Sequence, residues 1–237
     1  GRWGAGRSGR MTIAATGCAP EYAEYMPHYP LKETKGSSHY VFRQLVGHGQ
    51  DVLDVGCGEG YFAEQLVADG NRVYGIDLLE SPKRAAAFQK YVRANADQGI
   101  GGVIPQLEGQ KFDKVLLQDV LEHLNAPEKT LLDVKDTLKP SGLLLVSVPN
   151  VANITVRLSL LFGRFEYTQR GILDKTHVRF FTRRTARRLD AAPLVPHVRE
   201  RIREVPVRRR RRARRAARGG DDDHLADRGA RLRVGQD

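Results

Sequence analysis

The stretch Val52-Leu53-Asp54-Val55-Gly56-Cys57-Gly58-Glu59-Gly60 is an apolar run that ends in three alternate glycines. It predicts a buried strand over Asp51–Val55, a tight turn, and a helix over Gly60–Asp69. Glycine at alternate positions lets the turn bend sharply and lets a ligand lie against bare backbone. The free amide groups at the start of the helix would face polar or anionic ligand atoms. The stretch therefore predicts a ligand site at the carboxyl end of this strand.

The spacing of these glycines argues against a nicotinamide or flavin dinucleotide, because the G-x-G-x-x-G pattern needs glycine where this chain has Tyr61. Asp54 is placed to accept from an ammonium group, which a methionine moiety has and a dinucleotide lacks. Asp77 ends a second predicted strand, Arg72–Asp77, and is placed to bind a ribose diol, with Leu78 flanking an adenine ring. Each element is a weak signal alone, but together, in this order and spacing, they are specific.

Strand-like and helix-like segments alternate between about residues 31 and 188, which predicts an α/β fold with a doubly wound, mostly parallel sheet. Leu143–Val148 is the most apolar of the predicted strands, so we expect it at the centre of the sheet. The other predicted elements are a helix over Ser81–Ala96, a strand over Phe112–Gln118 and a helix over Pro127–Leu138.

Four ordered blocks resemble class I S-adenosylmethionine-dependent methyltransferases: VLDVGCGEGYF, VYGID, FDKVLLQDVLEHL and LKPSGLLLVSVPN. The resemblance covers about residues 52–182 and is nearest to the branch that modifies small molecules such as quinones and other metabolites. It implies a Rossmann-like fold, S-adenosyl-L-methionine as cofactor, and methyl transfer to a small-molecule acceptor, for which we expect an oxygen. The acceptor itself and the oligomeric state are not predicted, since acceptor pockets share no motif.

The resemblance also implies which residues bind the cofactor. Its pattern places one of Asn95, Ala96 and Asp97 beside the adenine, and Gln118 and Asp119 facing the sulfonium and its methyl group. The predicted cofactor-binding residues are Asp54, Gly56, Cys57, Gly58, Gly60, Asp77, Leu78, Asp97, Gln118 and Asp119. We expect Cys57 to pack under the cofactor rather than to react.

His177 and His123 are the candidate catalytic residues. A sulfonium is already a good methyl donor, so the protein mainly positions the acceptor, and a base is needed only for a protonated nucleophile. Histidine has a suitable pKa for that base. A structural role stays open for both. The resemblance implies that the LEHL stretch opens a helix whose turn Glu122 and His123 stabilise, and His177 is alternatively a surface or hydrogen-bonded structural histidine. No metal ligands are predicted.

The segment between the last predicted strand and His177 is the candidate acceptor side. Arg157, Arg164 and Tyr167 are predicted to form a lid over the acceptor, whereas Leu160 and Phe162 are expected in the core.

The net charge of +11 is unevenly distributed: residues 183–237 carry +10, the first ten residues +3, and the remainder −2. We predict a partly disordered extension over 1–30, a methyltransferase domain over 31–207, and an Arg-rich disordered tail over 208–237. The tail is either an arm that binds phosphate backbones or a reading-frame artefact, and its lack of lysine favours the artefact. The alternative function is therefore nucleic-acid binding through this tail, with an inactive methyltransferase-like domain; the near-neutral remainder does not favour it.

The carboxyl-terminal part departs from the family pattern, which continues after Thr182–Leu189 with a helix and two further strands. Only Val198–Val207 alternates like a strand, so we expect an incomplete sheet and a marginally stable protein. Two cysteines and the lack of an apolar run of about 18 residues predict a cytoplasmic protein without a membrane span.

Overall fold

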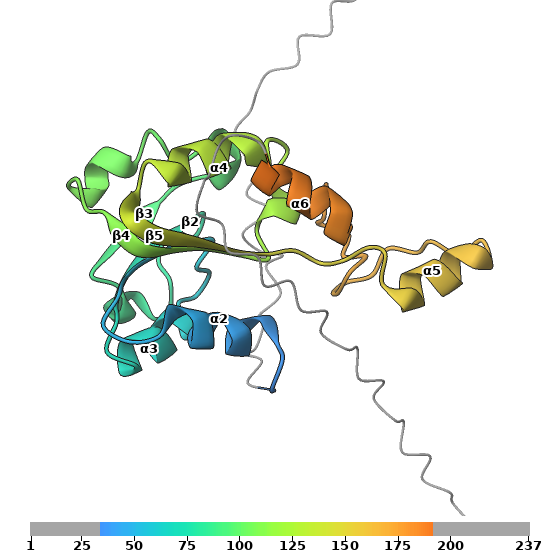
Figure 1. The fold of residues 1–237 in the computed structure, drawn as a ribbon, viewed down its shortest axis with the longest axis horizontal. Coiled ribbons are helices and arrows are strands. Elements are labelled where there is room, and N and C mark those ends of the chain that lie inside the picture. Colours follow the sequence, from blue (N-terminus) through green and yellow to red (C-terminus); the bar gives the residue numbers. More distant parts are fainter. Residues whose placement is uncertain (1–33, 192–237) are drawn as a thin grey trace, which may run out of the picture. The chain divides into compact units, whose positions relative to one another are not determined.

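The computed structural model describes residues 34–191, in which five parallel strands form one sheet (Figure 1). The strands are β1 (Asp51–Val55), β2 (Arg72–Asp77), β3 (Lys90–Arg93), β4 (Phe112–Gln118) and β5 (Leu138–Ser147). Their order is β3-β2-β1-β4-β5, which confirms the predicted α/β class. The direction of strand addition reverses at β1, and parallel sheets bind ligands outside the carboxyl ends of the strands at such a point.

Helices cover both faces of the sheet (Figure 1). Two of them, α2 (Ser38–Val46) and α3 (Tyr61–Ala68), lie on one face, and α4 (Pro127–Lys135) and α6 (Arg183–Ala191) lie on the other. A further helix, α5 (Ile154–Leu161), projects away from the sheet. The remaining elements are the 3₁₀ turns η1 (Ala85–Ala87), η2 (Ala96–Gln98), η3 (Ile104–Leu107) and η4 (Leu121–His123).

Strand β1 shows why the sheet needs a layer on each side, since all five of its residues are buried. Val52 packs in the cluster that contains Phe62 of α3, whereas Leu53 and Val55 pack in the cluster that contains Leu131 of α4. Successive side chains of a strand point to opposite faces, so an apolar strand of this kind requires helices on both.

The predicted strands β1, β2 and β4 and the helix α3 are confirmed, and α4 ends at Lys135, three residues before its predicted end. The predicted helix over Ser81–Ala96 is wrong, because this segment contains η1 and β3. Phe88 is buried against Gly75 of β2, and the Gln89 amide donates to the Val73 carbonyl at 2.7 Å. Burial against the open side of β2 therefore outweighs the local helix signals.

Strand β5 differs from its prediction in extent and in position. It begins at Leu138 and includes Pro140-Ser141-Gly142, which was expected to end a helix, with a register shift opposite Phe112 and Lys114. Within the described sheet it lies at an edge, so the prediction that it is central is wrong. The carboxyl-terminal helix begins at Arg183, earlier than expected.

Some predictions lie outside the described residues: the extension over 1–30, the strand over Val198–Val207 and the tail over 208–237. The boundaries proposed for the three segments therefore stay predictions. Within residues 34–191, no helix has both the length and the apolarity needed to cross a bilayer.

Four charged side chains join the amino ends of the central strands into what we call the amino-edge network: Asp51, Arg72, Asp113 and Lys139. The Lys139 Nζ lies 2.9 Å from Asp51 and 2.8 Å from Asp113, and the Arg72 guanidinium lies 2.6 Å from Asp51. Burial opposes the ionisation of Asp51, but its two cationic partners outweigh burial and hold its pKa below the usual value. The network fixes the strand ends opposite to the predicted ligand site.

Candidate functional site

The glycine turn between β1 and α3 can be built only with glycine at its first position. Gly56 has φ +80°, and a Cβ there would lie 2.5 Å from Cγ2 of Val120. The amides of Gly56 and Cys57 donate to the Ile76 carbonyl at 2.7 and 3.4 Å. Gly60, with φ +83°, is the N-cap of α3. The turn is thus fixed against β2 and presents backbone rather than side chains, as predicted.

Asp77 lies at the end of β2 and is oriented by two backbone amides. Its carboxylate accepts from the Gly58 amide at 2.7 Å and from the Leu79 amide at 3.0 Å. Each carboxylate oxygen retains a further lone pair, so Asp77 keeps the acceptors needed for a ribose diol. Leu78 follows it, and the Leu78 carbonyl accepts from Nε of Arg93 at 3.2 Å.

Asp54 is a buried carboxyl at the end of β1, with 3% of its surface exposed. Burial, together with the nearby charge of Asp77, raises the pKa of Asp54 to about 7. A cation beside it would offset both effects and restore the carboxylate. The two carboxyl groups beside this turn therefore fit a ligand that brings an ammonium group to Asp54 and a diol to Asp77.

Cys57 is buried beneath the turn, and a Cβ on Gly75 would lie 2.9 Å from its Sγ. Burial raises the pKa of the Cys57 thiol well above its usual value, and the charges of Asp54 and Asp77 raise it further. A neutral thiol is a poor nucleophile, so the expectation that Cys57 packs rather than reacts is consistent with its environment.

Asp97 uses its carboxylate within the fold. It accepts from the Asn125 amide at 2.6 Å, from the Asn125 side chain at 2.6 Å and from the Ala126 amide at 3.2 Å. Burial alone would raise its pKa, but these bonds outweigh burial and hold the pKa below its usual value. Asp97 thus secures the start of α4, and its contact with adenine stays a prediction.

Gln118 and Asp119 lie at the carboxyl end of β4 and are held by two serines that sequence reasoning missed. The Gln118 side chain donates to Ser38 Oγ at 3.2 Å, and Ser147 Oγ donates to Asp119 at 2.7 Å. Asp119 has φ +55°, an uncommon conformation for a residue with a side chain. The pair Ser37-Ser38, with Ser37 as the N-cap of α2, was the available signal for this contact.

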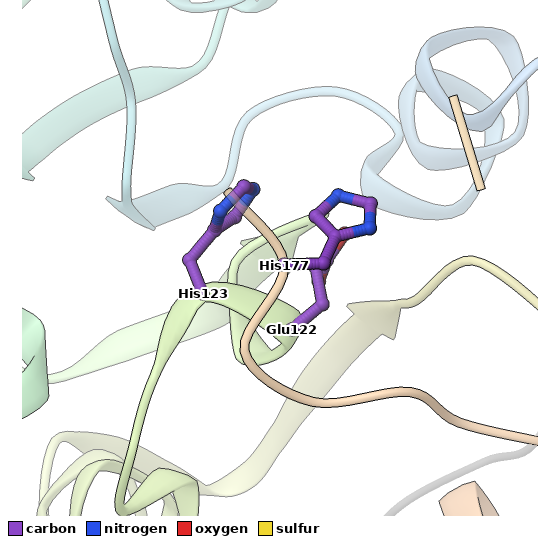
Figure 2. A group of neighbouring side chains, drawn as sticks. All are labelled: Glu122, His123 and His177. Atoms are coloured by element: carbon purple, nitrogen blue, oxygen red, sulfur yellow. The ribbon is translucent and has the colours of Figure 1, made fainter. Parts of the chain in front are cut away.

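Glu122, His123 and His177 form a group that we call the Glu-His-His cluster (Figure 2). One ligating atom from each residue lies within 4.8 Å of the others. The Nδ1 atoms of His123 and His177 lie 3.2 and 3.1 Å from the carbonyls of Thr176 and Ile172. A carbonyl only accepts, so each neutral ring carries its proton on Nδ1 and leaves Nε2 as an acceptor.

The electrostatics of the cluster follow from burial. Burial raises the pKa of Glu122 far above its usual value, and the charges of Asp119 and Asp174 add to the effect. Neither carboxylate oxygen of Glu122 has a hydrogen-bond partner among the described residues. Burial also lowers the pKa of His123, as does His177, so the neutral imidazole is favoured.

Backbone hydrogen bonds join the two segments that carry the cluster, η4 and the segment around His177. The carbonyl of Glu122 accepts from the amides of Val178 and Arg179 at 2.9 and 3.0 Å, so the later segment is fixed to η4. The implied helix start at LEHL is wrong, because η4 is a single 3₁₀ turn and α4 begins at Pro127. Among residues 34–191, the Glu122 carboxylate has no hydrogen bond by which it could stabilise that turn. Both histidines were predicted from the sequence, but Glu122 was not predicted to lie in the same site.

The segment predicted as an acceptor lid is largely exposed. Leu160 and Phe162 have 48% and 74% of their surface exposed, so their expected place in the core is wrong. Tyr167 contacts the ring of Phe180, and Phe180 contacts the ring of His177, with centroid distances of 6.2 and 6.3 Å. The lid role of Arg157, Arg164 and Tyr167 stays a prediction.

Known proteins share this sequence pattern and fold. Residues 22–191 match the family described as Methyltransferase domain. Ubiquinone biosynthesis O-methyltransferases of Rickettsia felis and Coxiella burnetii are 29% and 32% identical over 147 and 141 residues. These matches cover 58% of this chain and 58% and 59% of those proteins, so the chain spans less than two thirds of their length. A methyltransferase structure from Archaeoglobus fulgidus is similar, with TM-score 0.47, 19% identity, and 67% and 70% of the two chains covered.

The glycine turn, the buried carboxyl of Asp54 and the carboxylate of Asp77 suit the cofactor that this family uses. The match extends over more than half of the chain and includes every described strand. The chain therefore belongs to the methyltransferase-domain family.

Proposed function

We propose that this chain is an S-adenosylmethionine-dependent methyltransferase that modifies a hydroxyl oxygen of a small planar molecule bound beside the Glu-His-His cluster. The observation that carries the proposal is a pair of imidazoles just beyond the carboxyl end of β4, each with Nδ1 bonded to a backbone carbonyl and Nε2 left for another partner. A hydroxyl must lose its proton during methyl transfer, and an unprotonated imidazole nitrogen is a suitable acceptor for it. His177 and His123 are the proposed catalytic residues.

The cofactor half of the proposal rests on the residues around the glycine turn. When bound, S-adenosylmethionine supplies an electrophilic methyl group on a sulfonium. Asp54 would hold its ammonium group, Asp77 its ribose diol, and the backbone of Gly56 and Gly58 its methionine chain. Gln118 and Asp119 would face the methyl group, because they lie between the glycine turn and the cluster along the carboxyl edge of the sheet.

The acceptor half is supported by rings next to His177. Phe180 contacts His177, and Phe165 and Tyr167 contact Phe180, which provides flat apolar surface for an aromatic acceptor. The relatives named above are O-methyltransferases, which agrees with an oxygen acceptor. A phenolic hydroxyl is the acceptor that combines these features.

Methyl transfer from labelled S-adenosylmethionine to paired acceptors tests the proposal. The panel contains catechol and simple phenols, each with the matching aromatic amine. We expect label in the phenols and its loss in Asp77→Ala, which removes the ribose acceptor but leaves the cluster unchanged. Label in the amines with none in the phenols would contradict the proposal.

The alternative of nucleic-acid binding through residues 208–237 concerns a segment outside the described residues. It stays a prediction, tested by removing those residues and measuring the affinity for DNA or RNA at two salt concentrations.

A further inference from the structure

The Glu-His-His cluster has the composition of a metal site. Two imidazole nitrogens and one carboxylate oxygen are the protein ligands of many catalytic zinc and iron centres. Each imidazole donates from Nδ1 to a backbone carbonyl, that of Thr176 for His123 and that of Ile172 for His177. Metal-binding histidines almost always donate their second ring N–H in this way, because the bond fixes the ring and the tautomer.

Glu122 lacks a partner that would explain its burial. Its side chain is 1% exposed, and neither oxygen accepts a hydrogen bond from the described residues. Burying a carboxyl group without a partner is costly, whereas a bound cation supplies the missing charge.

The distances are compatible with a cation after small side-chain rotations. The three ligating atoms lie within 4.8 Å of one another. Two ligands about 2.1 Å from a tetrahedral zinc ion are about 3.4 Å apart. The site therefore has to close by about 1.4 Å at most to hold the ion.

The backbone around the cluster is already held in place. Glu122 and His123 belong to η4, and the segment that carries His177 is fixed to η4 by two hydrogen bonds to the Glu122 carbonyl. Figure 2 shows the three side chains converging from these two segments. His123 is more accessible than the other two residues and provides the side from which an ion enters.

We propose that Glu122, His123 and His177 bind one divalent transition-metal ion, with Zn²⁺ as the best match to two nitrogens and one oxygen. Three protein ligands leave coordination positions open, as in catalytic rather than structural zinc sites. The ion would lie beyond the carboxyl end of β4, where the acceptor hydroxyl is expected. Only this last placement rests on the proposed function; binding of the ion does not.

A Zn²⁺ titration of the full chain tests the site. The protein is first stripped with a chelator, and binding is followed by competition with a chromophoric chelator, without cofactor or acceptor. We expect one Zn²⁺ per chain, with an affinity at least about 100-fold weaker in Glu122→Gln and in His177→Gln. His48→Gln is the matched control, because His48 lies in the exposed turn after α2, and its affinity should equal that of the unmodified chain.

Two further measurements keep the result interpretable. Unchanged affinity for S-adenosylhomocysteine shows that a variant is folded. Co²⁺ bound to the unmodified chain should give visible absorption without a thiolate charge-transfer band, since the proposed ligands contain no sulfur.

Absence of stoichiometric Zn²⁺ binding, or equal binding by Glu122→Gln and His177→Gln, would overturn the inference. Methylation of phenols by a chain that binds no Zn²⁺ would overturn this inference alone. Zn²⁺ binding without methylation of any hydroxyl would contradict the proposed function alone.

Discussion

Replacing Asp54 by asparagine should make the cofactor-free protein more stable at neutral pH and weaken its binding of the cofactor. Burial, with the charge of Asp77, raises the pKa of Asp54 from 3.8 to about 7. When folding raises the pKa of a carboxyl, there is a pH range in which the group is ionised in the unfolded chain but protonated in the folded one. Ionisation of Asp54 therefore costs stability as the pH rises from about 4 to about 7.

The size of the effect follows from the shift. One pKa unit corresponds to 1.36 kcal/mol, so a shift of about three units costs about 4 kcal/mol above pH 7. The stability advantage of Asp54→Asn should grow by about 1.4 kcal/mol per pH unit between pH 4 and pH 7 and then level off. Affinity for S-adenosylhomocysteine should be about tenfold higher at pH 8 than at pH 6 in the unmodified chain, because its ammonium group needs the carboxylate.

Urea unfolding from pH 4 to pH 8, paired with calorimetric titration at pH 6 and pH 8, measures both quantities. Asp136→Asn is the matched control, since it makes the same replacement at an exposed residue at the end of α4. A stability difference between Asp54→Asn and the unmodified chain that is constant over this range would refute the reasoning. So would an affinity in Asp54→Asn as high and as pH-dependent as in the unmodified chain.

Three further substitutions test other parts of the structure. Gly56→Ala should lower the free energy of unfolding by about 2–4 kcal/mol in thermal unfolding, because its Cβ meets Val120 at a positive φ. Gly70 has the same φ but open space around it, so Gly70→Ala should lower that free energy by only about 1 kcal/mol. Equal losses of stability in the two variants would contradict the clash. Lys139→Gln should lower the free energy of unfolding measured with urea at pH 7, since two carboxylates of the amino-edge network lose their cation. Those carboxyls have lowered pKa values, so their contribution is present above pH 3.8 and is lost as the pH falls; a difference that persists at pH 2 would exclude it. Asp97→Ala should cost about 2 kcal/mol by calorimetry through three lost hydrogen bonds, and an unchanged melting temperature would show that they contribute nothing.

The sequence predicts those parts of the fold whose signals are local. The glycine turn, the strand before it and the strand that ends at Asp77 are each encoded within a few residues, and all lie where expected. The segment Ser81–Ala96 fails because Ser81 and Pro82 carry the local signals of a helix start, whereas the burial of Phe88 and Val92 depends on the distant strand β2. No sequence pattern within that segment indicates that part of it pairs with β2.

The same distinction divides the candidate site. Asp54 and Asp77 lie at the carboxyl ends of neighbouring parallel strands, so topology alone brings them to one edge of the sheet. His177 is 54 residues from His123 in the sequence, and the two come together because the segment that carries His177 is hydrogen-bonded to the Glu122 carbonyl. Both histidines were selected for their chemistry, but only the structure shows that they share a buried carboxyl.

One hydrogen bond closes the acceptor-side segment at its two ends, so the length of this segment can change without changing the geometry of the site. The Val151 amide donates to the Phe181 carbonyl at 2.8 Å, so the intervening chain leaves the sheet and returns to it at one point. Residues 161–170 within it are exposed throughout. Because the entropy cost of a loop rises by only about 0.6 kcal/mol for each doubling of its length, insertions there are cheap. Under the proposed function, the set of molecules that the protein methylates can therefore change by lengthening or shortening this one loop, while the two ends of the loop stay joined beside the Glu-His-His cluster.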